Sequence, residues 1–403
     1  MLNDEVKPTG FILGYIDKRK TLHETNIASA TPRRYSFVEA TTVTEDINLG
    51  LTGKGKFTVD GFSESASDSV IDLGGSSRHS GFDLSDVTEF IMNNVTVSGG
   101  DTALNLDKSG ATAKLTNVVL EDNTSAIQNL TGKVDLISVE VIKTPSIAND
   151  IYNSGEMNIT DTNIYTIVSN DGQFKTSGTN VINKFTNTAT VNLIGTSDTV
   201  TEFDNSDEGA LLKTLGDTSI DKLTNSGTVQ TDGNNMFINV TNNNIVQFKS
   251  KNTVSNLFTN YATLTAQGET SITSLTNKGT VTAEGTNTIG TVTNESTGSI
   301  ELFGTEDTIT LLKNIGGTVT TKAKTTISTI ENSGTIDAAG TSVFGGISNT
   351  GTIILKNDVT LNGDITDSGL TEMHGNVLYD AAGASIVKVQ KLDLKDTSVL
   401  DLV

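Results

Sequence analysis

The sequence predicts an all-β fold, a single right-handed parallel β-solenoid whose regular turns take 17–20 residues each, with longer turns near the N-terminus. Three observations predict it. An Asn or Asp returns at nearly constant spacing, apolar residues recur at fixed places before it, and the composition suits short strands and tight turns. Only 35% of the residues are hydrophobic and 5% aromatic, whereas Thr, Asn, Ser and Gly are abundant.

One phrase recurs from the middle of the chain onward: an apolar residue, any residue, Asn or Asp, a small residue, Gly, Thr, and Val or Ile. Clear copies are residues 223–229, 275–281, 330–336 and 347–353. We predict structural turn residues at the marked Asn or Asp, because Asn tolerates the left-handed backbone conformation. They form either simple exposed turns or a ladder of amides stacked from turn to turn. The marked residues are Asn153, Asn170, Asn187, Asn205, Asn225, Asn242, Asn260, Asn277, Asn294, Asn314, Asn332, Asn349 and Asp367.

Apolar residues form two columns in this register. The residue two places before the mark is apolar at all thirteen marks, and a second column lies five places before many of them. Alternating apolar and polar residues predict short strands with one buried face, which must stack to be stable. Stacking should bring Leu275 and Val292 side by side, and the Gly found two residues after many of the marks should supply a positive φ or a close backbone approach. The second column contains Tyr165, Ile182, Val200, Ile220, Ile272, Ile289, Ile309, Ile327 and Phe344.

The register divides the chain. Residues 1–45 do not fit it and are predicted to be an N-terminal cap or a leader, and residues 46–403 to be the solenoid. The turns should be longer up to about residue 150 and regular over 151–370, with a truncated end to 403 that suggests a piece of a longer protein. In the longer turns, Asn94, Asn117, Ser138 and Asn158 should be equivalent, and residues 52–73 should form the first full turn.

The composition narrows the chemistry. The net charge of -21 argues against binding to nucleic acid or to anionic lipid, and the lack of Cys excludes disulfides and Cys-ligated zinc. No apolar run is long enough for direct membrane insertion by this segment. His23, His79 and His374 are scattered, and the only local group of reactive types is Arg78–His79. We therefore predict no catalytic residue, no cofactor and no metal site.

The Asn-Ser-Gly-Thr-Val/Ile units at residues 225–229 and 332–336, within a Thr- and Asn-rich acidic chain, resemble the passenger region of bacterial autotransporters and related surface adhesins. The resemblance covers roughly residues 50–403. It implies an exported β-helix that is displayed on a Gram-negative outer membrane or secreted, and anchored by a part not present in this chain. It further implies a role as an adhesin, a self-association module or a rigid stalk, with a surface receptor, a glycan or a second copy as partner. Two alternatives stay open, a polysaccharide-degrading β-helix enzyme and a phage tail-spike-like fibre.

Overall fold

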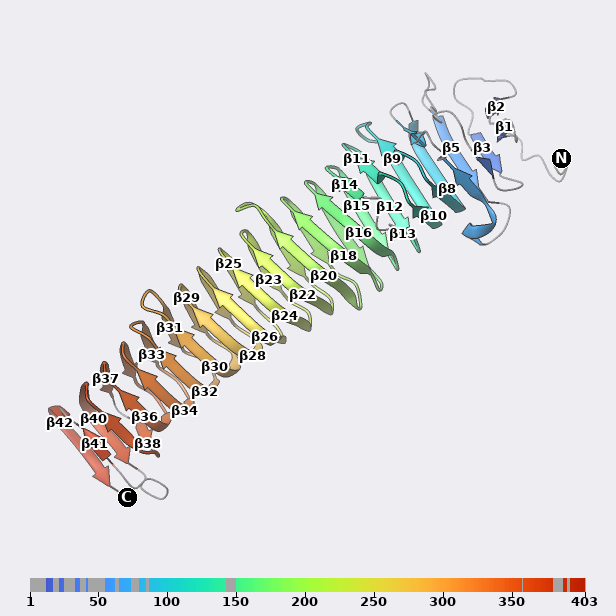
Figure 1. Ribbon diagram of the computed structural model, residues 1–403. Coiled ribbons are helices and arrows are strands. Elements are labelled where there is room, and N and C mark those ends of the chain that lie inside the picture. Colours follow the sequence, from blue (N-terminus) through green and yellow to red (C-terminus); the bar gives the residue numbers. More distant parts are fainter. Residues whose placement is uncertain are drawn as a thin grey trace. The chain divides into compact units, whose positions relative to one another are not determined.

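The computed structural model is all-β apart from one short 3₁₀ helix, η1 (Ala66–Asp68), among the described residues. It describes residues 12–16, 22–24, 33–36, 41–42, 55–61, 65–73, 80–84, 87–142, 150–356, 358–379, 387–389 and 392–402. The chain divides into two compact units, residues 1–203 and 204–403. Within each unit, successive strands stack in parallel as a β-solenoid (Figure 1). The predicted fold class is therefore confirmed.

The strands of the first unit are β1 (Ile12–Ile16), β2 (Leu22–Glu24), β3 (Arg33–Ser36), β4 (Thr41–Thr42), β5 (Gly55–Asp60), β6 (Val70–Asp72), β7 (Phe82–Asp83), β8 (Val87–Ser98), β9 (Thr102–Leu106), β10 (Thr112–Glu121), β11 (Ser125–Asn129), β12 (Lys133–Ile137), β13 (Glu140–Ile142), β14 (Asp150–Asn153), β15 (Glu156–Thr160), β16 (Asn163–Asn170), β17 (Gln173–Ser177), β18 (Val181–Asn187), β19 (Thr190–Leu193) and β20 (Asp198–Asn205), whose end belongs to the second unit.

The strands of the second unit are β21 (Leu211–Thr214), β22 (Thr218–Asn225), β23 (Thr228–Thr231), β24 (Asn235–Asn242), β25 (Ile245–Phe248), β26 (Asn252–Asn260), β27 (Thr263–Ala266), β28 (Glu269–Asn277), β29 (Thr280–Ala283), β30 (Thr286–Asn294), β31 (Ser299–Leu302), β32 (Glu306–Asn314), β33 (Thr318–Thr321), β34 (Thr325–Asn332), β35 (Thr335–Ala338), β36 (Ser342–Asn349), β37 (Thr352–Leu355), β38 (Val359–Leu361), β39 (Ile365–Asp367), β40 (Leu370–Tyr379), β41 (Val387–Val389) and β42 (Leu392–Leu402). Through β36, its turns combine a long strand of eight or nine residues with a short one of four.

The predicted apolar columns form the core. Leu275 lies beside Val292 in the register of β28 and β30. The residue two places before every marked Asn or Asp is buried. The second column is buried as well, with one exception: Tyr165 is 46% exposed. An irregularity between β16 and β18 shifts the register, so Ile164 pairs with Ile182 and takes the core place that we had predicted for Tyr165.

The register predicted for the longer turns of the first unit is right for Asn94, Asn117 and Ser138 and wrong for the fourth residue. Asn117 lies beside Asn94, and their side chains are hydrogen-bonded at 2.8 Å, but the fourth equivalent residue is Asp161 and not Asn158. Asn94, Asn117, Ser138 and Asp161 all have a positive φ, between 49° and 57°. The shared feature of this corner is thus its left-handed backbone, which Asn, Asp and Ser can all adopt at a cost.

Parallel pairing extends upstream of residue 46. Strand β3 pairs in parallel with both β5 and β1, whereas β1 and β2 pair antiparallel. Strand β5 is therefore not the first strand of the parallel stack, and the prediction that residues 52–73 form the first turn is wrong. The role of residues 1–45 as a cap or a leader stays a prediction.

The Gly two residues after a marked Asn has a positive φ at Gly316 but serves close approach at Gly334 and Gly351. A Cβ added to Gly351 would lie 2.2 Å from the carbonyl oxygen of Gly334, one turn before, and neither residue has a positive φ. Ala262 occupies the same place in its own turn, so the backbone adapts where a methyl group is present. Turn stacking at this corner is tight enough to favour small residues.

Candidate binding face

The marked Asn residues line one corner of each unit, and the structure brings them into contact. Within each unit, each buried amide donates from Nδ2 to the Oδ1 of the next, at 2.7–3.0 Å, in an asparagine ladder. Each Nδ2 also lies within bonding distance of carbonyl oxygens; that of Asn277 donates to Gly279 and Ser299 at 3.0 and 3.1 Å. The first unit holds Asn153, Asn170 and Asn187, and the second unit holds Asn205 through Asp367.

The ladder of the first unit begins one turn earlier than predicted. Asn129 donates to Asn153 at 2.7 Å and is fully buried. The sequence signal was present, since the apolar Ile127 lies two places before Asn129. It was missed because the interval of 24 residues falls outside the regular spacing.

The ladder has a direction, and an Asp ends it. Asp367 accepts from Asn349 Nδ2 at 3.0 Å and from the backbone N–H of Gly369, and it has no amide with which to donate onward. Its register partner in the next turn is Val389, which offers no acceptor side chain. An acceptor-only residue therefore fits the last place.

A second buried polar column, which the sequence analysis missed, lies at another corner. In the first unit Asn180 donates to Asp198 at 2.7 Å, and in the second unit Asn287 donates to Asp307 at 2.7 Å. Burial raises the pKa of both carboxyl groups. Mixed residue types hid this column; in the second unit its members are Thr218, Asn235, Asn252, Thr270, Asn287, Asp307, Thr325 and Ser342.

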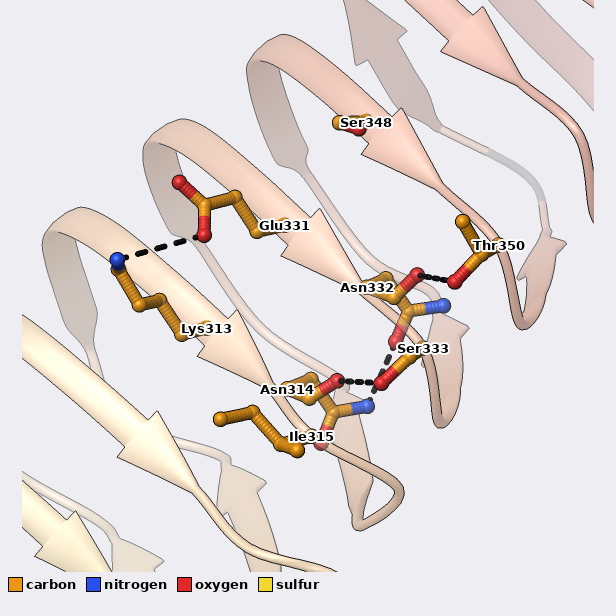
Figure 2. A pocket seen from close by; sticks show the side chains of 8 residues that line it. All are labelled: Lys313, Asn314, Ile315, Glu331, Asn332, Ser333, Ser348 and Thr350. Atoms are coloured by element: carbon orange, nitrogen blue, oxygen red, sulfur yellow. Dashed lines mark hydrogen bonds and ion pairs between the residues drawn. The ribbon is translucent and has the colours of Figure 1, made fainter.

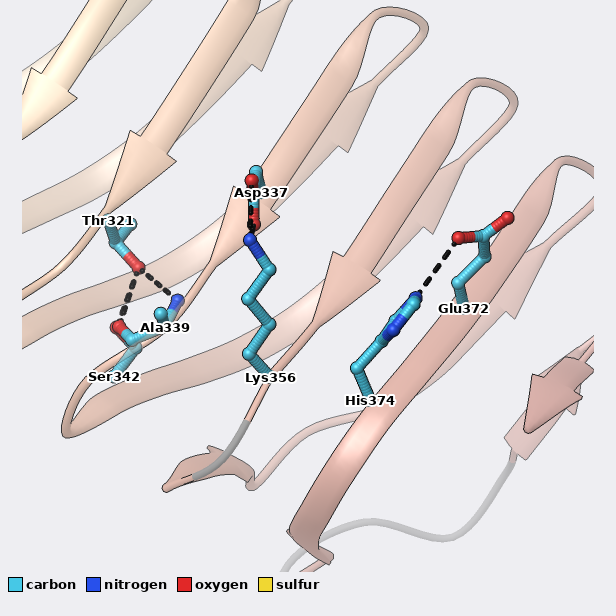
Figure 3. Close-up of polar contacts among 7 residues, drawn as sticks. All are labelled: Thr321, Asp337, Ala339, Ser342, Lys356, Glu372 and His374. Carbon is cyan, nitrogen blue, oxygen red and sulfur yellow. Dashed lines mark hydrogen bonds and ion pairs between the residues drawn. The ribbon is translucent and has the colours of Figure 1, made fainter. Parts of the chain in front are cut away.

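Other polar groups pair locally. Figure 3 shows His374 directed at Glu372, 3.2 Å away, and Lys356 paired with Asp337 at 2.7 Å. It also shows the Ser342 hydroxyl 2.8 Å from that of Thr321, at the second polar column. The side chain of His23 and the Arg78–His79 group lie outside the described residues. In the described part of the chain, no group of three His, Cys, Asp or Glu side chains could hold a metal ion.

The outer side of the long strands is nearly free of charge. We define the long-strand face as the solvent-facing residues between the two buried polar columns on β24, β26, β28, β30, β32, β34 and β36, all of them described. Its only charged side chains are Lys313 and Glu331, and these pair with each other at 3.4 Å. The chain as a whole carries a net charge of -21. The net negative charge of the chain therefore lies outside the long-strand face.

Hydroxyl groups form columns on the long-strand face. Thr241, Thr259, Thr276 and Thr293 are register partners in successive turns. A second hydroxyl column on the same face consists of Thr253, Ser271, Thr288, Thr308 and Thr326. No hydroxyl of either column hydrogen-bonds to another group within the described part of the chain, so their donors and acceptors face solvent.

An open cavity of about 390 Å³ lies where the first column meets the ladder corner. Lys313, Glu331 and Ser348 continue the column past Thr293 and line one side. Figure 2 shows Ile315, Ser333 and Thr350 lining the turn beside them, where the two hydroxyls donate to ladder carbonyl oxygens at 3.3 Å. Ile315 is 53% exposed, so the cavity combines hydroxyl groups, one ion pair and an apolar side chain.

These features define a parallel β-solenoid with two buried polar columns and an outer face on which the only two charged side chains pair with each other. Comparisons with known protein families, with curated proteins and with solved structures found no match. Within the described ranges, no helix has the length and apolar character needed to cross a membrane. The fold alone therefore defines the class of this protein. Its role must be inferred from the surfaces that the turns present.

Proposed function

We propose that the chain is a non-catalytic binding module of an exported protein, of the autotransporter-passenger type, that acts as an adhesin at the cell surface. The observation that carries this proposal is the long-strand face, where unpartnered hydroxyls repeat from turn to turn without net charge. Buried amides at the corner hold the turns in register beneath it. A repeating surface on a hydrogen-bonded scaffold suits contact with an extended ligand.

Export and surface display come from the resemblance of the repeat units to autotransporter passengers, and they belong to this proposal. The long-strand face favours adhesion over a simple stalk, because a spacer would need no face with repeated free hydroxyls and no net charge. Self-association, the rigid stalk, the glycan-degrading enzyme and the trimeric fibre are the competing roles.

The test is binding of the fluorescently labelled chain to mammalian cells, bacterial cells and matrix-coated surfaces. We expect saturable binding to at least one of them, together with labelling of intact source cells by antibodies against the chain. The proposal would be wrong if the chain bound none of these surfaces and the antibodies reached it only after cell lysis. Release of reducing ends from glycans would favour the enzyme, and a stable trimer in sedimentation would favour the fibre.

A further inference from the structure

The lack of unpaired charged side chains on the long-strand face argues against a charged ligand as its main partner. A polyanion or an acidic peptide is normally held by unpaired cationic side chains, and a basic ligand by unpaired carboxylates. Lys313 and Glu331 neutralise each other on this face. The short-strand side of the same unit differs, since Glu301 lies in its solvent-facing column without an ion-pair partner among the described residues. The neutrality of the long-strand face is therefore local.

The hydroxyl columns match an uncharged polymer that is itself rich in hydroxyls. Each Thr offers one donor, two acceptor lone pairs and a methyl group, and successive turns repeat them at about 4.8 Å. Thr259, Thr276 and Thr293 have no partner among the described residues for those groups. A polysaccharide has hydroxyls to pair with them and apolar C–H faces that can cover the methyl groups.

The cavity beside Ile315 adds a second, independent feature. It opens at the edge of the face and is lined by hydroxyl groups, the mutually neutralising Lys313–Glu331 pair and an aliphatic side chain, and a sugar ring likewise combines hydroxyl groups with apolar C–H faces. We propose that the long-strand face binds an uncharged polysaccharide that runs along the stacked turns, with one sugar unit in this cavity. This inference rests on the proposed binding function and names its ligand class.

Affinity electrophoresis in native gels tests it. The net charge of -21 drives migration, and an uncharged polymer cast in the gel retards the protein relative to a non-binding reference protein only if the protein binds it. The probes are dextran, mannan, galactomannan and mixed-linkage β-glucan, with alginate and pectate as acidic polymers for comparison. We expect retardation by at least one uncharged polymer and by neither acidic one.

Two double variants locate the site. Thr276→Ala with Thr293→Ala removes two neighbouring hydroxyls of the long-strand face. Thr265→Ala with Thr282→Ala is the matched control, because these half-buried residues are also register partners in neighbouring turns but lie on the short-strand side. The first pair should weaken binding by about tenfold and the second should leave it within about twofold. Thermal melting of both variants checks that the fold is kept.

Several outcomes would overturn the inference. Retardation by none of the uncharged polymers, or by the acidic ones alone, rejects the ligand class. Equal weakening by both double variants rejects the face. A concentration-dependent dimer that Thr276→Glu with Thr293→Glu abolishes would show that the face joins two copies. If cell binding persists without any polysaccharide binding, this inference fails while the proposed adhesin function stands.

Discussion

The two buried polar columns of the second unit differ in how their polar side chains find hydrogen-bond partners. Both place polar side chains at a corner, inside the solenoid, in turn after turn. The asparagine ladder uses Asn in every turn until Asp367, and each amide bonds to the next. The second column mixes Asn, Thr, Asp and Ser, and its bonds between turns are interrupted. An unbroken ladder needs a group that both donates and accepts at each place, which Asn supplies.

The interruptions leave buried atoms without partners. Asn235 Oδ1, Thr270 Oγ1, Asn287 Oδ1 and Thr325 Oγ1 are buried and make no hydrogen bond within the described part of the chain. Asp307 accepts from Asn287 and passes no bond to Thr325, its partner in the next turn. Unpaired buried groups cost free energy, so the second column should contribute less to stability than the ladder does. The following predictions compare the contributions of the two columns to stability, and two of them change residues of the same strand, β28.

The largest effect is expected for Asn277→Ala, in the middle of the ladder. The substitution removes the acceptor of Asn260 and the donor to Asn294, and it leaves both partners buried. We expect a loss of about 3–5 kcal/mol in the free energy of unfolding, since each unpaired buried group costs about 1–3 kcal/mol. Urea unfolding followed by circular dichroism measures it. A loss below about 1 kcal/mol would mean that the ladder adds little beyond packing.

Next comes Asn260→Asp, which places an acceptor-only group inside the ladder. It can still accept from Asn242, but it cannot donate to Asn277 or to the carbonyl oxygens of Ala262 and Thr280. We expect a loss of about 2–4 kcal/mol at neutral pH from the missing bonds and the buried charge. The control is Asp367→Asn at the end of the ladder, where Thr371 can accept from the new amide, and where about 1 kcal/mol or less should be lost. Equal losses in chemical unfolding would contradict a directional ladder.

The contrast between the columns also explains what the sequence could predict. Because the ladder tolerates little besides Asn, it was visible as a repeat, and it fixed the register of the apolar columns. The second column accepts several small polar residues, so it left no repeat to find. Asp161 and Tyr165 were misplaced for a related reason: a left-handed corner tolerates several residue types, and a local register shift adds a residue to the strand. The long-strand face depends on that register in every strand, so it emerged only from the structure.

A smaller and pH-dependent effect is expected for Asp307→Asn in the second column. Burial raises the pKa of Asp307 in the folded state above the unfolded value of about 3.9. The folded chain therefore binds this proton more tightly, and the stability that it confers is present below about pH 4 and is lost as the pH rises through the folded pKa. Melting temperatures across this range should fall less with rising pH in Asp307→Asn than in the wild type. The exposed Asp232→Asn should follow the wild type; a parallel course of all three would refute the effect.

The smallest effect should come from Thr270→Val, on the same strand as Asn277. Thr270 is 2% exposed and its hydroxyl has no partner in the described part of the chain, so the nearly isosteric Val removes an unpaired polar atom and keeps the packing. We expect a change within about 1 kcal/mol, toward higher stability. The same urea unfolding measures it beside Asn277→Ala. A clear loss would show that Thr270 bonds to Asn287, its neighbour one turn on, whose Oδ1 is also unpaired, and that the second column is a working ladder after all.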